Sequence, residues 1–141
     1  MATFDHSIDL PAPPDQVFAL VAEARNAVRW HPAIVRADRA DEAVTLGSVT
    51  DSVFTFYGRE IELAFAVTEL QEPRRVVFEA ASRRARARDE FDIEAADGGS
   101  RLRYRSELHL GGFLRVFDRG LQVAFDGIGR RALDGLGREL A

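Results

Sequence analysis

The sequence lacks cysteine and lysine, and it contains no long apolar run. Without cysteine, the chain has no disulfide framework, no thiolate nucleophile and no cysteine-ligated zinc site. Its longest unbroken apolar stretch, residues 17–22, is far too short to cross a bilayer. Residues 1–6 have neither the basic start nor the apolar run of a signal peptide. We therefore expect a protein without a membrane span, located in the cytoplasm.

The chain also lacks an excess of positive charge: 23 acidic residues outnumber 19 basic ones, and the net charge is −4. This balance argues against broad electrostatic binding to nucleic acid or to anionic membranes. Hydrophobic residues make up 46% of the chain and charged residues 30%, which excludes general disorder. A length of 141 residues fits one domain, so we expect residues 1–141 to form a single unit.

Periodicity predicts the secondary structure. Residues 3–10 alternate between apolar and polar, as a half-buried strand does. Prolines at 11, 13 and 14 end this strand and start a helix, and a shorter helix is predicted from Asn26 to Trp30. Further strands are predicted near residues 33–40, 48–57, 60–70, 74–82, 85–96 and 100–110. Apolar residues spaced by three or four then predict a long final helix from Leu114 to Leu140.

Turn sequences at 57–60, 71–74 and 97–100 predict the registers of three hairpins. If each turn is centred, the following residues lie opposite each other: Phe56 and Ile61, Phe54 and Leu63, Val67 and Phe78, Phe65 and Ala80, Ile93 and Tyr104, and Phe91 and Ser106. These registers gather the aromatic residues on one face of the sheet. The other face of the last hairpin pairs Glu94 with Arg103 and Asp92 with Arg105, so we expect it to be solvated. The aromatic face needs a cover, and the C-terminal helix is the only predicted element long enough.

Two sequence motifs carry a family resemblance. The chain reads IDLPAPPDQVF at 8–18 and WHP at 30–32, with a looser match at 58–60 and 70–78. In these segments it resembles the START-like polyketide cyclase/dehydrase and lipid-transport (SRPBCC) superfamily. The resemblance implies an α+β helix-grip fold: a seven-stranded curved antiparallel sheet around a long C-terminal helix, with two short helices after the first strand. It also implies a pocket between sheet and helix. Members include lipid carriers, hormone receptors, cyclases or aromatases, and protein-binding domains, and the fold does not choose among them.

The predicted inner face mixes large and small side chains, which favours a cavity for a hydrophobic or aromatic ligand. The alternative is an ordinary core in which large and small residues interdigitate. The candidate walls are Phe54, Phe56, Phe65, Phe78, Phe91 and Tyr104, and the candidate lid is Phe117, Leu121 and Phe125. Five glycines in the final helix either leave volume beneath it or allow close packing of its backbone.

Asp89 is predicted to face inward, where a bare charge is costly. With Tyr104 and Ser106, which lies diagonally across, it forms a candidate polar spot that orients a ligand or performs acid–base chemistry. His6 also points inward and is the third candidate for catalysis. Alternatively, a bulge turns Asp89 to solvent and His6 is a satisfied core residue. The three dispersed histidines have no metal-ligand spacing, so we expect neither a metal nor another cofactor.

The sequence therefore supports three functions. The first is binding, or carrying, a small hydrophobic ligand. The second, by resemblance, is a polyketide cyclase, aromatase or dehydratase activity that uses Asp89 with Tyr104 or His6. The third is a protein-interaction module, for which Val49, Val53 and Tyr57 on the outer face are the only hint of an apolar patch. A homodimer is left open.

Overall fold

The chain forms the predicted order of one strand, short helices, six strands and a final helix. The computed structural model describes residues 1–40 and 42–141, apart from the side chains of residues 113 and 117. The first part comprises β1 (Ala2–Leu10), α1 (Pro14–Ala22), the 3₁₀ helix η1 (Ala24–Asn26) and α2 (Ala27–Trp30). The remaining elements are β2 (Ile34–Asp38), β3 (Val49–Phe56), β4 (Arg59–Gln71), β5 (Arg75–Ala81), β6 (Ala85–Ala96), β7 (Gly99–Leu110), the 3₁₀ helix η2 (Gly112–Phe117) and α3 (Leu121–Glu139).

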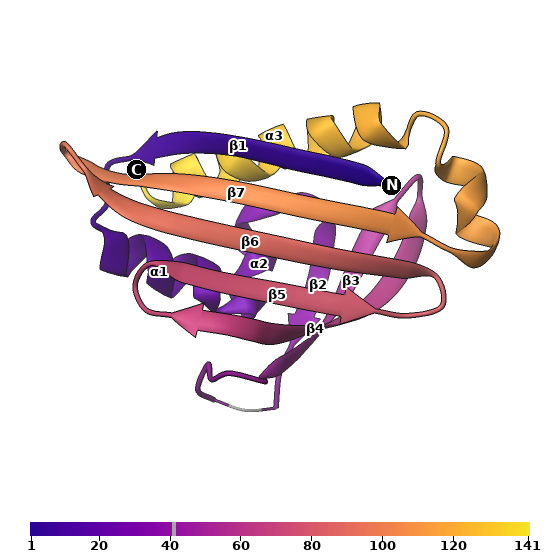
Figure 1. Cartoon of the computed structure of the whole chain (residues 1–141), viewed down its shortest axis with the longest axis horizontal. Helices are drawn as coiled ribbons and strands as arrows, with labels where there is room; N and C mark the ends of the chain where they lie inside the picture. The colour runs from indigo at the N-terminus through magenta and orange to yellow at the C-terminus, as the bar shows by residue number, and fades with distance from the viewer. Residues whose placement is uncertain (41) are drawn as a thin grey trace.

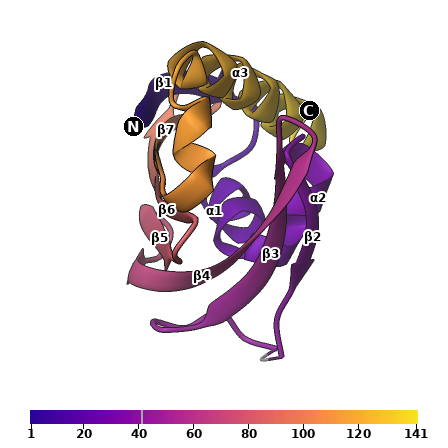
Figure 2. The same ribbon diagram turned by 90° about the vertical axis from the view of Figure 1, so that its right-hand side faces the viewer.

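All seven strands belong to one antiparallel sheet in the order β1-β7-β6-β5-β4-β3-β2 (Figure 1). The sheet curves so strongly that β2 and β3 turn back to face β6 and β7 (Figure 2). Helices α1 and α2 lie inside the curve, and α3 runs across its open side along β1 (Figures 1 and 2). This is the predicted α+β helix-grip fold, a half-barrel closed by helices.

Two helices, rather than the C-terminal one alone, cover the inner face of the sheet. Helix α3 packs against β1 and α2, whereas α1 contacts β5, β6 and β7. Pro13 and Pro14 start α1 in extended and then helical backbone, and its buried face includes Val17 and Val21. Because the sheet is curved rather than flat, α1 fills the hollow that a single helix across the opening does not reach.

The final helix begins later than predicted. Leu114 belongs to η2, and α3 starts only at Leu121. Gly120 separates the two helices with a φ of 81°, a left-handed conformation that interrupts a right-handed helix. The prediction missed this break because the three-to-four spacing of apolar residues continues through it. At the other end, the helix runs to Glu139 without a break at its glycines.

Two helix glycines mark close backbone contacts. A β-carbon on Gly135 would lie 2.1 Å from the carbonyl oxygen of Trp30, and one on Gly129 would lie 2.5 Å from the ring of Phe4. By contrast, nothing lies within 4 Å of a β-carbon built on Gly137. Of the two explanations for the helix glycines, close packing therefore holds at positions 129 and 135.

Two hairpin registers differ from the predicted ones by two residues. The prediction places residues 98 and 99 at the tip of the β6–β7 turn, whereas the observed turn consists of Asp97 and Gly98. As a result, Asp89 lies opposite Ser106 and Phe91 lies opposite Tyr104. The β3–β4 turn is displaced in the same way, which places Phe54 opposite Ile61 and Phe56 opposite Arg59. The predicted Val67–Phe78 pairing is confirmed. A shift of two residues keeps every side chain on its predicted face, because side chains alternate with a period of two.

Candidate ligand-binding site

A cavity lies between the inner face of the sheet and the helices. Its volume is about 70 Å³. The sheet contributes Ile34, Ser52, Phe54, Leu63, Phe65, Phe78, Ala87, Asp89, Phe91, Tyr104, Ser106, Glu107 and Leu108. The helices and their connections contribute Val21, Ala24, Ala27, Trp30, His31 and Phe125. This is several times the roughly 10–15 Å³ that a cavity needs to hold one water molecule.

Stacked aromatic rings form one wall of this cavity. The rings of Phe91 and Tyr104 are parallel to within 5°, with centroids 4.6 Å apart. Trp30 meets Phe91 edge-on at 5.9 Å and Tyr104 at 6.3 Å, and Phe78 meets Phe91 edge-on at 6.2 Å. All four residues are buried. Their mutual packing holds the rings in place and presents an apolar surface to the cavity.

Asp89 and Ser106 are the polar pair beside this wall. They lie directly opposite each other on β6 and β7, and the Ser106 hydroxyl donates a hydrogen bond to Oδ1 of Asp89. Burial raises the pKa of Asp89 to about 6, although the hydrogen bond from Ser106 acts in the opposite direction. The carboxyl group therefore changes protonation close to neutral pH.

The other titratable groups of the lining carry no positive charge near neutral pH. Burial, together with the negative charge of Asp89, raises the pKa of the Tyr104 hydroxyl well above its usual value. Burial lowers the pKa of His31 to about 4. The Nδ1 atom of His31 accepts a hydrogen bond of 3.2 Å from the backbone N–H of Ala33, which holds the ring at the cavity. No arginine is among the described residues of the lining.

Trp30, which also lines the cavity, carries an unsatisfied hydrogen-bond donor. The residue is 6% exposed, and its indole N–H has no hydrogen-bond partner in the part of the chain that the structure describes. Leaving a buried donor unpaired costs about 1–3 kcal/mol. A residue that lines a cavity and keeps a free donor can satisfy it with a bound molecule.

Most of the residues predicted to bind a ligand do line the cavity. They are Phe54, Phe65, Phe78, Phe91, Tyr104, Ser106 and Phe125. Phe56 and Leu121 are buried but lie outside the lining. The side chain of Phe117 lies outside the described part of the structure.

Of the three catalytic candidates, the structure brings two together. Asp89 and Tyr104 both line the cavity, and Ser106 lies next to them. His6 does not line it. Although His6 lies opposite Tyr104 in the β1–β7 register, its ring packs against Phe4 at 4.6 Å. Since Phe4 itself lies under Gly129 of α3, the first strand contributes core packing rather than a group at the cavity.

Apart from Phe125, the residues that the helices contribute to the site were not predicted. They include Ala24, Ala27, Trp30 and His31. The aromatic–histidine pair in the WHP motif is the one local signal that could have indicated Trp30 and His31. The alanines carry no such signal, because their place depends on how the short helices enter the curve of the sheet.

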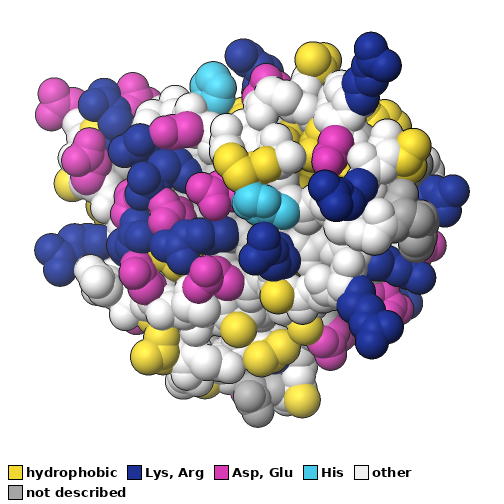
Figure 3. Space-filling model, turned by 45° about the vertical axis from the view of Figure 1, so that its right-hand side comes forward, with side chains coloured by type: hydrophobic (Ala, Val, Ile, Leu, Met, Phe, Trp, Pro, Cys, Tyr) yellow, Lys and Arg dark blue, Asp and Glu magenta, His cyan; other side chains and the backbone are white. Residues whose placement is uncertain are grey.

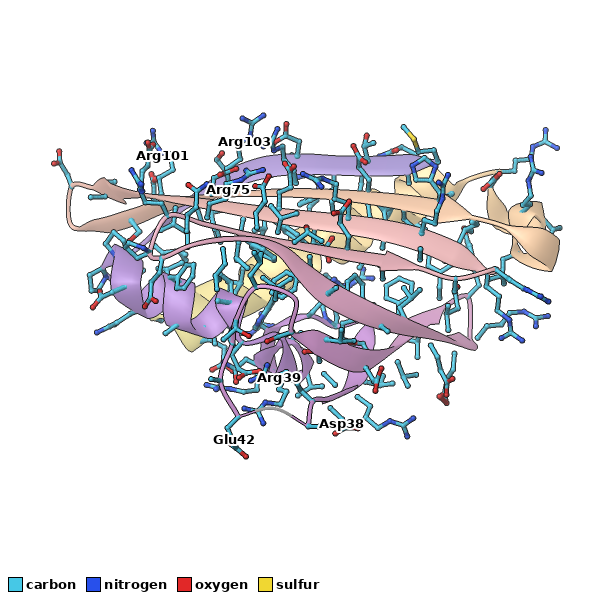
Figure 4. The ribbon with its side chains drawn as sticks, turned by 60° about the horizontal axis from the view of Figure 1, so that its bottom comes forward. Asp38, Arg39, Glu42, Arg75, Arg101 and Arg103 are labelled. Atoms are coloured by element: carbon cyan, nitrogen blue, oxygen red, sulfur yellow. The ribbon has the colours of Figure 1, made fainter. Side chains whose placement is uncertain are left out.

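The outer face of the sheet is a network of ion pairs, as the alternation of charges predicts. Arg75 contacts Glu69 at 2.5 Å and Asp92 at 2.8 Å. Glu90 is shared by Arg88 at 2.7 Å and Arg105 at 2.6 Å. Figure 3 shows arginines and acidic residues intermixed on this face, and Figure 4 shows Arg75 with Arg101 and Arg103. This surface is neutralised from within the chain.

A second ion cluster fixes the connection between β2 and β3 to the helices. Both carboxylate oxygens of Glu23 accept hydrogen bonds of 2.6 Å from Arg39, whose side chain is 2% exposed. Burial alone would raise the pKa of Glu23, but the hydrogen bonds from Arg39 and Arg25 lower it to about 2. Arg39 also donates to the backbone carbonyl of Glu42, which lies beside it in Figure 4. This cluster anchors η1, and with it Ala24, at the cavity.

Two further features are missing from the part of the chain that the structure describes. None of its histidine, aspartate and glutamate residues form a cluster that could hold a metal ion. None of its helices is both long and apolar enough to cross a membrane.

The curved antiparallel sheet closed by a C-terminal helix places the chain in the class of helix-grip domains. Within this class, residues 1–141 match the family described as polyketide cyclase / dehydrase and lipid transport, and the chain belongs to that family. This confirms the resemblance seen in the sequence. No curated protein matches the chain.

Solved structures agree on the fold. Protein TTHA0849 from Thermus thermophilus superposes with a TM-score of 0.81 at 13% identity, covering 98% of this chain and 96% of its own. Protein CV1439 from Chromobacterium violaceum gives 0.72 at 14% identity, with the same two coverages. Ara h 8.0201 gives 0.62 at 18% identity, covering 95% of this chain and 96% of its own. At these identities the likeness concerns the fold alone.

Proposed function

We propose that the protein binds a small, mainly apolar ligand containing a single ring in the cavity between the sheet and the helices. The observation that carries this proposal is an aromatic cavity whose polar groups are not all satisfied. Asp89 has a hydrogen bond to one carboxyl oxygen, and Trp30 has a free indole N–H among the described residues. An ordinary filled core provides partners for such groups. Membership of a family named for cyclases and lipid transport also supports binding of a small molecule.

The size of the cavity narrows the ligand. A volume of about 70 Å³ is smaller than the roughly 150 Å³ of a protein cavity that holds benzene, so a ligand with one ring already requires the lining to yield slightly. A sterol or a fused multi-ring compound would need the helices to move much further outward. Gly135 packs so closely against Trp30 that such a movement would disturb the contact between α3 and α2.

The test is to fill the cavity. We expect native mass spectrometry of freshly purified protein to show a small-molecule adduct that solvent extraction releases. The variant Ala87→Phe places a ring in the cavity and should lose the adduct while remaining folded. Ala95→Phe is the matched control, because Ala95 lies on the same strand but is exposed and outside the lining. A wild-type protein that takes up neither a natural adduct nor added ethylbenzene would overturn the proposal.

One observation favours an enzyme as the second candidate. A carboxyl group with a pKa of about 6 can both accept and donate a proton near neutral pH. In that case Asp89 would be the acid–base group, with Ser106 positioning it. The variant Asp89→Asn separates the two functions. If the protein is a carrier, the variant still binds and releases the ligand. If it is an enzyme, the variant binds the substrate but no longer converts it.

The protein-interaction alternative has less support. It requires a filled core and an apolar patch on the outer face. Val49 and Tyr57 are exposed, but Val53 is buried between neighbouring strands, where Arg36 and Glu62 lie opposite it. The core contains a cavity instead of being filled.

A further inference from the structure

The charge inside the cavity is unbalanced. Asp89 is the one carboxylate among the inward-facing lining residues, and its only hydrogen-bond partner within the described residues is Ser106. No positively charged side chain from the described part of the chain lines the cavity to compensate it. This contrasts with Glu90, the next residue along β6, which is paired with arginines on the outer face.

The groups that face Asp89 do not supply a positive charge. From β7 this is the Tyr104 hydroxyl, and from the end of α2 it is His31. Tyr104 is neutral when protonated, and its raised pKa keeps it so. His31, with its lowered pKa, is also neutral at physiological pH. With Asp89 ionised, the potential in the cavity therefore favours a cation and disfavours an anionic ligand.

Besides the carboxylate of Asp89, the aromatic rings of the cavity wall can also attract a cation. Phe91, Tyr104 and Trp30 pack on one another beside Asp89, and Phe78 adjoins Phe91. The face of an aromatic ring carries negative potential and attracts an ammonium group placed within about 6 Å. A carboxylate next to several rings is the arrangement that recognises organic ammonium ions.

We propose that the ligand is a single-ring organic amine whose ammonium group pairs with Asp89 while its ring lies against Phe91, Tyr104 and Trp30. This inference rests on the proposed function and specifies its ligand class. An ammonium donates to the Asp89 oxygen that Ser106 leaves free, and it supplies the charge that the chain does not. A neutral alcohol can supply the hydrogen bond but not the charge.

Binding should depend on pH with a defined sign. An ammonium group beside Asp89 favours the ionised carboxylate, so the amine binds more tightly as the pH rises through about 6. Below that pH, binding releases a proton from Asp89. The affinity of a neutral ligand of the same shape falls or stays constant as the pH rises, because such a ligand leaves the carboxylate unpaired.

The experiment compares three probes of nearly equal shape: 2-phenylethylamine, 2-phenylethanol and ethylbenzene. Their affinities are measured by titration calorimetry at about pH 7.5, where the amine is protonated and Asp89 is ionised. We expect the amine to bind wild-type protein about tenfold more tightly than the alcohol, or better, equivalent to about 1.4 kcal/mol. The variant Asp89→Asn should remove this advantage while leaving the alcohol within about threefold.

The matched control is Glu94→Gln, which removes the same charge from the exposed outer side of the same strand. It should leave the preference for the amine intact, which distinguishes the cavity from general attraction by an acidic protein. An alcohol that binds as tightly as the amine, or an amine affinity that Asp89→Asn leaves unchanged, overturns the amine proposal but leaves the proposed function standing. If none of the three probes binds and the purified protein carries no adduct, both are overturned; if only the probes fail, the amine proposal alone is overturned.

Discussion

Asp89 and Glu90 are consecutive residues of one strand, yet their carboxyl groups behave in opposite ways. Both are half-buried, and burial acts to raise both pKa values. For Asp89 on the inner face, burial prevails and the pKa rises to about 6. For Glu90 on the outer face, a hydrogen bond from Arg88 and the charges of Arg105 and Arg75 outweigh burial, and the pKa falls.

The difference shows that the two faces of one sheet have different roles. Ion pairs on the outer face stabilise the fold, and the inner face forms the proposed binding site. On the outer face the charged groups pair with one another, although the buried Nε of Arg105 has no hydrogen-bond partner among the described residues. At the cavity, the Asp89 carboxyl group has no positively charged partner in the described part of the chain, and the indole N–H of Trp30 has no hydrogen-bond partner there. Natural proteins tolerate such local costs where function requires them. Three sets of variants examine this contrast, from the largest expected effect to the smallest.

The largest effect should come from the aromatic wall. Phe91→Ala removes a ring that contacts Trp30, Phe78 and Tyr104. We expect it to lower the free energy of unfolding by about 3–5 kcal/mol, as removal of a buried phenylalanine does. Glu94→Ala, on the exposed side of the strand, should change it by less than about 0.5 kcal/mol. Denaturant unfolding measures both, and equal losses would contradict a packed inner wall.

The second effect is a pair of opposite pH dependences. Because the pKa of Asp89 is raised on folding, its ionisation opposes folding, and this cost grows as the pH rises from about 4 to about 6. Asp89→Asn should therefore be more stable than wild type by about 2–3 kcal/mol at pH 7, with the difference vanishing near pH 4.

Glu90→Gln should show the reverse. The pKa of Glu90 is lowered on folding, so its carboxylate stabilises the protein above its ordinary pKa, and this stability is lost as the pH falls through the lowered value. The variant should be less stable than wild type at neutral pH and approach it in acid. Unfolding curves across this pH range measure both variants, and parallel curves would remove the distinction between the two faces.

The smallest effect should come from the arginines of the outer face. Arg75→Gln breaks contacts with Glu69 and Asp92, while Glu90 retains Arg88 and Arg105. We expect a loss of about 1 kcal/mol that shrinks as salt is added. Arg101→Gln breaks a single exposed pair with Asp9 and should cost less than about 0.5 kcal/mol. Thermal unfolding at low and high salt tests this order.

Much of the fold could be predicted because strand alternation is a local signal. The predicted strands agree with the observed ones to within a few residues, and the inner positions of Phe65, Phe78 and Phe91 follow from their parity. The registers of two hairpins could not be obtained this way, since they depend on which two residues occupy the turn. At Tyr57, with a φ of 51°, the β3–β4 turn uses a conformation that is unusual for tyrosine.

The presence of the cavity could not be predicted from the sequence. Whether large and small side chains leave a void depends on how the helices settle into the curve of the sheet. Trp30 and His31 reach the cavity from a four-residue helix whose direction no periodicity encodes. Asp89 could be placed on the inner face by alternation, but its direct contact with Ser106 required the true register.

That contact depends on where a distant turn is placed. Gly98 occupies the turn with a φ of 78°, whereas Gly99 belongs to β7, where a β-carbon would lie 2.0 Å from the carbonyl oxygen of Leu10. If the turn moved by one residue, to Gly98 and Gly99, the alternation of both strands would survive, but Asp89 would lie opposite Leu108 and lose its hydrogen bond to Ser106. Substitutions at this tip, far from any lining residue, can thus alter what the cavity recognises. Ligand preference in this fold can evolve through the position of a hairpin turn as well as through substitution of the wall.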